Sequence, residues 1–227
     1  MNFLKIFGFG SAKEKEEFDY PFFVEVRIYE QILPVERGER YEDPLALFLE
    51  SKNLGTVSGG GSSLRDRAQE GERDIEYVNI DVELANLGEA KEVLKQKLIE
   101  LGVPIDTEIS YRDSEDNKQT EIIGELELLD IFIDILGHDE KIYENTDWDA
   151  MFEDLHNSLK ESNAGELRAD CSWNSETLVY FAGKSADNMF EILEPITKKY
   201  PVLNNARVVF HRKDKSKQPQ EIKLISS

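Results

Sequence analysis

Residues 167–182, LRADCSWNSETLVYFA, have the pattern of a β-hairpin and decide the fold of the region around them. Apolar residues alternate with polar ones along the first arm: Leu167, Ala169, Cys171 and Trp173. Asn174-Ser175 supplies a turn, and a second strand returns over Glu176–Ala182. A period of two is typical of a strand that buries one face, and a short turn joins two such strands into a pair. The stretch therefore predicts antiparallel β-structure.

On each side of this hairpin the sequence predicts a helix and then a strand. The preceding helix follows Thr146, and the following helix begins after Ser185; both carry apolar residues at helical spacing. An opening strand at Leu129–Ile135 and a closing strand at Ala206–His211 complete the unit. The order is strand, helix, hairpin, helix, strand.

The same order occurs about a hundred residues earlier. Phe22–Ile28 is the opening strand, Asp43-Pro44 starts a helix, and Gly55–Leu64 pairs with Ile75–Leu84 before a second helix and the closing strand Ile105–Tyr111. A βαββαβ order gives a four-stranded antiparallel sheet with both helices on one face, the ferredoxin-like arrangement. The sequence therefore predicts an α+β protein built as a tandem duplication of a ferredoxin-like domain.

The domain boundaries expected from this pattern are a flexible N-terminal arm at 1–20, a first ferredoxin-like domain at 21–113, a linker at 114–121, a second ferredoxin-like domain at 122–213 and a C-terminal tail at 214–227.

The sheet faces turned away from the helices differ between the two halves. In the first half this face carries polar side chains such as Glu25 and Arg27, whereas in the second half it carries Leu126, Leu128 and Phe132. An apolar face needs a partner. We therefore expect the first domain or another subunit, in a homo-oligomer, to cover the second sheet. The second half would then be the structural platform, and the first half would carry the recognition surface.

The charge of the chain favours basic partners. It has 47 acidic against 27 basic residues, a net charge of −20. Such a field repels nucleic-acid phosphates and attracts cationic proteins. No stretch is long and apolar enough to suggest a membrane span. The single cysteine, Cys171, excludes a disulfide within the chain and fits a reducing, cytoplasmic location.

Motifs of catalytic or metal sites are missing from the sequence. The three histidines, His138, His156 and His211, have no zinc-ligand spacing, and no nucleophile motif occurs. Cys171 is in phase with apolar neighbours, which favours a buried structural thiol. We therefore expect no catalytic residues, no metal and no cofactor.

The strongest candidate for a ligand-binding loop is the glycine-rich run Gly59-Gly60-Gly61-Ser62-Ser63, which Arg65 follows. Backbone amides and hydroxyls of this kind can hold an anion. A glycine-rich strand is also typical of a bulge or of close packing. Both interpretations stay open.

Carboxylates supply the remaining candidate binding residues. Asp81 and Glu83 lie on one face of a strand, and Asp147 and Asp149 belong to an acidic cluster around the first helix of the second half. Paired acids can serve acid–base chemistry or hard metals, although a solvated face has the same composition.

The pattern Tyr41-Glu42-Asp43-Pro44, Gly55, Gly59-Gly60-Gly61 and Ile75–Leu84 resembles uncharacterised small acidic bacterial ferredoxin-like proteins of the immunity or inhibitor type. This resemblance covers mainly the first half. It implies a non-enzymatic protein that neutralises a basic partner.

Three functions remain open from the sequence. The first is a non-enzymatic acidic interaction module, such as an immunity or inhibitor protein. The second is a regulatory protein that binds a small molecule or anion with Gly59–Ser63 and the interface between the domains. The third is an enzyme that uses carboxylates without a recognisable motif.

Overall fold

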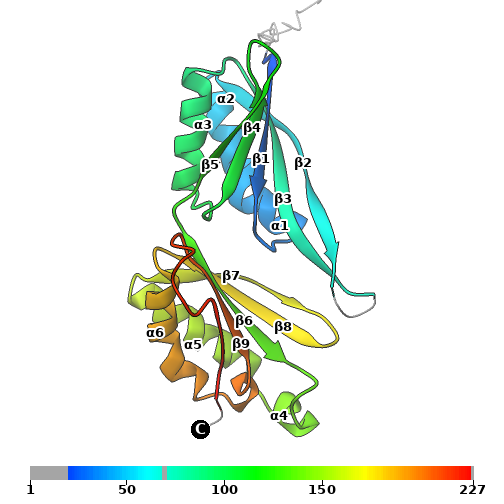
Figure 1. Cartoon of the computed structure of the whole chain (residues 1–227), viewed down its shortest axis with the longest axis vertical. Helices are drawn as coiled ribbons and strands as arrows, with labels where there is room; N and C mark the ends of the chain where they lie inside the picture. The colour runs from blue at the N-terminus through cyan, green and yellow to red at the C-terminus, as the bar shows by residue number, and fades with distance from the viewer. Residues whose placement is uncertain (1–19, 68–70, 226–227) are drawn as a thin grey trace, which may run out of the picture.

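Two five-stranded antiparallel sheets, each with helices against it, follow one another along the long axis of the molecule in the computed structural model (Figure 1). The structure describes residues 20–67 and 71–225. Most of the expected N-terminal arm lies outside them. The α+β class and the antiparallel sheets are confirmed.

The first sheet has the strand order β2-β3-β1-β4-β5. Its strands are β1 (Phe22–Ile28), β2 (Gly55–Asp66), β3 (Arg73–Leu84), β4 (Thr107–Arg112) and β5 (Lys118–Ile123). Its helical segments are α1 (Pro34–Arg37), the π-helical η1 (Gly38–Glu42), α2 (Asp43–Ser51) and α3 (Glu89–Glu100).

The second sheet has the order β7-β8-β6-β9-β10, which is the same order at the corresponding places in the chain. Its strands are β6 (Glu127–Asp134), β7 (Gly165–Ser172), β8 (Glu176–Gly183), β9 (Arg207–His211) and β10 (Glu221–Lys223). Its helical segments are α4 (Glu140–Glu144), α5 (Trp148–Glu161), α6 (Ala186–Thr197) and the 3-10 turn η2 (Pro201–Leu203). None of the helices in the described ranges is long and apolar enough to cross a membrane.

The sequence predicted four strands in each sheet, whereas each sheet has five. β5 begins inside the expected linker, and β10 lies in the expected tail. Both are short edge strands with a single neighbour, β4 and β9 respectively. The side chains of β5 alternate between half-buried and exposed and none is fully buried, so its sequence has little of the apolar alternation that marks a strand.

Each domain has its core between the helices and one face of its sheet. In the first domain Val24, Val26 and Ile28 of β1 are fully buried beneath α2 and α3. In the second, Leu129, Ile131 and Ile133 of β6 are fully buried beneath α5 and α6. The expected period-two burial of these two opening strands is therefore observed.

The opposite face of the second sheet is covered by the first domain. Phe132, Leu178 and Tyr180 lie on this face, are at most 8% exposed, and belong to the same apolar cluster as the core of the first domain. Of the two covers expected for this face, the structure supplies the first domain. As a result β6 and β8 bury both faces.

Polar contacts join the two domains at the tip of the β2–β3 hairpin. Arg67 stacks on the Trp173 ring at 3.9 Å and pairs with Glu176 at 2.5 Å. The Trp173 indole donates to the carbonyl of Arg73 at 2.9 Å, and Glu72 accepts from the backbone N–H of Asn174 at 2.9 Å. The β2–β3 hairpin is therefore bound to the β7–β8 turn.

Candidate functional site in the cleft between the domains

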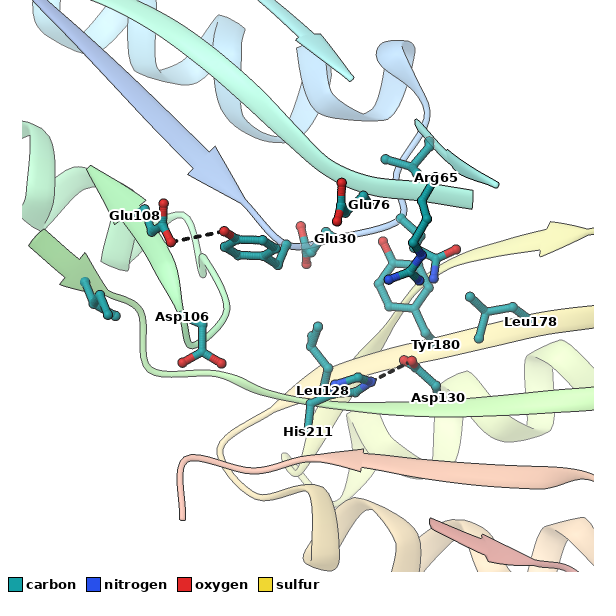
Figure 2. Close-up of a pocket in the computed structure, with 14 residues that line it drawn as sticks. Glu30, Arg65, Glu76, Asp106, Glu108, Leu128, Asp130, Leu178, Tyr180 and His211 are labelled. Carbon is teal, nitrogen blue, oxygen red and sulfur yellow. Dashed lines mark hydrogen bonds and ion pairs between the residues drawn. The ribbon is translucent and has the colours of Figure 1, made fainter. Parts of the chain in front are cut away.

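A cleft of about 520 Å³ opens between the two domains. Its first-domain wall comes from the segment after β1 and from residues of β2, β3, β4 and β5. Its second-domain wall comes from β6, β8 and β9 (Figure 2). This volume is in the range of ordinary ligand pockets. We call it the inter-domain cleft.

Carboxylates dominate the charge of this cleft. Five of its fourteen lining residues are acidic: Glu30, Glu76, Asp106, Glu108 and Asp130. The basic residues of the lining are Arg65 and His211. A concave surface with this balance favours a cationic group.

Several of these carboxylates are held in place by neighbours. The Tyr29 hydroxyl donates to Glu108 at 3.0 Å. On the other wall, His211 Nε2 lies 2.7 Å from Asp130 Oδ2 (Figure 2). Burial would lower the pKa of His211, but Asp130 outweighs burial and raises it, which favours the charged imidazolium.

Glu76 is the carboxylate of the lining with the weakest polar contact. It accepts a long hydrogen bond of 3.4 Å from Ser63, and it forms no ion pair with any described residue. Asp106 is paired at the rim with Lys215 at 2.5 Å. Glu76 is therefore the carboxylate most available to an incoming cation.

The closed end of the cleft contains a buried polar cluster. Glu30, which is 1% exposed, accepts a hydrogen bond of 2.6 Å from Tyr41 and lies 3.9 Å from Arg168 of the second domain. Burial raises the pKa of Glu30, although Arg168 opposes this effect. Burial and the charge of Glu30 raise the pKa of Tyr180 well above its usual value, so its hydroxyl stays protonated.

Local sequence explains how this cluster is positioned. Tyr41, Leu45 and Leu49 follow at intervals of four, so they share the buried face of the helical segment, and all are fully buried. Tyr41 stands at the end of that face nearest the second domain, where its hydroxyl reaches both Glu30 and Arg168. Arg168 also donates to the carbonyl of Gly102 at 2.8 Å.

Among the residues expected to bind, Arg65 lines the cleft. The run Gly59–Ser63 precedes it on the edge strand β2 and does not line the cleft. A Cβ on Gly60 would meet the Glu42 carboxylate and would lie 2.7 Å from the carbonyl of Asn79. Close packing therefore accounts for Gly60.

The other four expected residues are separate from the cleft. Asp81 accepts a hydrogen bond of 3.1 Å from Asn79 on β3, and Glu83 lies further along that strand. Asp147 is the N-cap of α5 and accepts from the backbone N–H of Ala150 at 3.1 Å, while Asp149 lies in the first turn. The structure does not bring the two pairs together.

The sequence pattern missed most of the cleft, although two signals were present. Asp130 interrupts the apolar run of β6, and a carboxylate inside such a run is a candidate for a buried, paired site. Glu30 follows directly after the buried strand β1. The cleft also supplies the concave group of carboxylates that the third, enzymatic hypothesis requires.

In the ranges 20–67 and 71–225, no three His, Cys, Asp or Glu side chains are grouped so that they could hold a metal ion. No protein-family model matches the chain, and none of the curated proteins compared with it matches either.

Proposed function

We propose that this chain is a non-enzymatic interaction protein that binds a basic protein partner at the inter-domain cleft, in the manner of an immunity or inhibitor protein. The observation that carries the proposal is the lining of the cleft, with five carboxylates against Arg65 and His211. The net charge of −20 adds long-range attraction, which accelerates the encounter with a cationic protein.

The walls of the cleft suit the side chains that such a partner carries. Leu128, Leu178 and Ile75 provide apolar surface beside the carboxylates. Lysine and arginine place an aliphatic stem on apolar surface and leave the charged end near an acid. The volume of about 520 Å³ leaves space for more than one side chain of an inserted loop.

We also propose that each domain is ferredoxin-like with one added edge strand, and that the two arose by duplication. The first four strands of each half follow the order β2-β3-β1-β4 and β7-β8-β6-β9, as a βαββαβ unit requires. The added strands β5 and β10 occupy equivalent edges, which supports the duplication.

A second candidate function is binding of a small molecule in the same cleft. The cavity volume favours it, because a pocket of this size between two domains is a common ligand site. An anion at Gly59–Ser63 is less favoured, since the carboxylates of Glu42 and Asp81 lie beside Gly60 and Gly59.

Calorimetric titration with an acetylated and amidated tetralysine peptide tests the first proposal. The peptide should bind the full chain, and raising the ionic strength should weaken binding strongly. A rim ion pair contributes about 0.5–1 kcal/mol, so the double variant Glu76→Gln, Glu108→Gln should weaken binding roughly five- to thirtyfold.

The matched control is the double variant Glu153→Gln, Glu191→Gln. It removes the same charge from exposed positions on α5 and α6, outside the cleft. Affinity that is unchanged by salt, or that falls equally in the two double variants, would contradict the proposal.

A further inference from the structure

We infer that the closed end of the inter-domain cleft is a binding site for a primary ammonium group on an aliphatic chain. The inference rests on the proposed function, because the lysine side chain of a basic partner is the first source of such a group. A free alkyl diamine is the second source, with the same chemistry at its end.

Three oxygen atoms in the lining of the cleft lack a hydrogen-bond donor among the described residues. They are Glu30 Oε1, Gln31 Oε1 and the hydroxyl of Tyr180, and all three residues line the cleft. Glu30 is 1% and Tyr180 is 2% exposed. In Figure 2 Glu30 lies on the first-domain side, and Tyr180 rises from β8 toward it. Buried polar atoms are normally paired, so three unpaired oxygen atoms in the lining of one cleft indicate a site for a donor.

An ammonium group fits these acceptors better than a guanidinium group does. Glu30 Oε2 already accepts from Tyr41, so only Oε1 is free. A guanidinium binds best as a planar fork to both oxygens of one carboxylate, whereas an ammonium offers three separate N–H donors. Three single acceptors from Glu30, Gln31 and Tyr180 match the second pattern.

Arg168 does not fill the role of this donor. Its Nη1 lies 3.9 Å from Glu30 Oε1, beyond hydrogen-bond distance. Its Nη2 donates to the carbonyl of Gly102, and its Nε lies 3.0 Å from Glu166. Its Nη1 donates instead to the Tyr41 hydroxyl at 3.4 Å. The guanidinium therefore forms an ion pair with Glu30 but leaves the hydrogen-bond acceptor Oε1 without a donor.

The outer part of the cleft would guide the ligand to this end. Glu76 forms no ion pair among the described residues, lines the cleft and is exposed to solvent. Leu178 and Ile75 line the path and can contact an aliphatic stem. The ring of Tyr29 also lines it and can attract a cation through its π face.

The test compares ligands and variants by calorimetry on the full chain. The ligands are 1,5-diaminopentane and three tetrapeptides made of lysine, arginine or Nε-acetyl-lysine. The variant is Tyr180→Phe, which removes one hydroxyl and retains the ring. The control is Tyr143→Phe, because Tyr143 lies beside Trp148 on the far side of the second domain and does not line the cleft.

We expect Tyr180→Phe to lower the affinity for the lysine peptide about tenfold, because it removes a hydrogen bond to a charged group. Tyr143→Phe should change the affinity little. The lysine peptide should bind more tightly than the arginine peptide, and the acetylated peptide should lose most of its affinity. Equal binding of lysine and arginine peptides, or an unchanged Tyr180→Phe, overturns the inference.

The outcomes separate this inference from the proposed function. If the lysine peptide binds both variants equally, the basic-partner proposal stands and the ammonium site is wrong. If the diamine binds and Tyr180→Phe weakens it while no peptide binds, the ammonium site stands and the basic-partner proposal is wrong. If neither the diamine nor any peptide binds, both are wrong.

Discussion

Replacing Glu121 by glutamine is expected to destabilise the first domain by about 1–2 kcal/mol at neutral pH. Glu121 lies on β5 and accepts from Lys91 at 2.5 Å and Lys95 at 2.6 Å, both on α3. The Tyr111 hydroxyl of β4 donates to the same carboxylate at 2.9 Å. This group therefore ties the edge strand to the helix.

The magnitude follows from the pKa of the carboxyl group. The hydrogen bond from Lys91, with that from Lys95, lowers the pKa of Glu121 from 4.5 to about 2. At full strength this difference corresponds to about 3 kcal/mol. The side chain is 29% exposed, so solvent screening reduces the expected contribution to about 1–2 kcal/mol.

The sign of the pH dependence follows from the same shift. Because the folded pKa is depressed, the contribution is complete above 4.5 and is lost as the pH falls toward about 2. Urea denaturation across this range should show a steeper loss of stability in the natural protein than in Glu121→Gln. The matched control is Glu100→Gln on α3. Glu100 forms an ion pair with Lys97, and its side chain is 65% exposed. Equal losses for the two variants at neutral pH would show that the Glu121 carboxylate adds no more stability than an exposed ion pair.

Three further predictions concern the interface, the closed end of the cleft and the glycine-rich strand. Arg67→Met should cost about 1–2 kcal/mol in urea denaturation, because it removes the cation stacked on Trp173 and the closest ion pairs of Asp74 and Glu176. These two carboxylates then keep only their longer pairs with Arg65 and Arg207. A loss below about 0.5 kcal/mol would contradict this. Burial raises the pKa of Glu30, so the natural protein should lose stability as the pH rises from 4.5 through that raised pKa, and Glu30→Gln should abolish this slope in unfolding curves measured against pH. Gly60→Ala should lower stability by about 1–2 kcal/mol, whereas Gly59→Ala, whose added Cβ would meet its nearest neighbour at 3.6 Å, should not; thermal unfolding that ranks the two equally would count against close packing at Gly60.

The strands and helices of both halves could be predicted because their apolar residues repeat at the periods of secondary structure. Val24, Val26 and Ile28 alternate along β1, and all three are buried as that pattern requires. The apolar outer face around Phe132 likewise predicted that something covers the second sheet. Strands β5 and β10 could not be found in this way, because their places at the sheet edge leave them mostly polar.

The cleft could not be predicted because its residues come from distant parts of the chain. Glu30 and Tyr180 meet only because the first domain packs on the outer face of β8, and no local pattern encodes that contact. Asp147 was predicted as a binding residue because acidic residues surround it in the sequence, but its carboxylate caps α5. A run of charge in the sequence does not show which carboxylates face a common space.

We propose that the cleft, and not the acidic surface in general, recognises a cation. Amide chemical shifts of the labelled full chain during titration with the tetralysine peptide test it most directly. If the cleft binds the cation, the largest changes fall at the residues that border it, 29–31, 106–108, 128–130 and 178–180. Changes centred on 147–154 of α5, or spread evenly over all acidic faces, would contradict it.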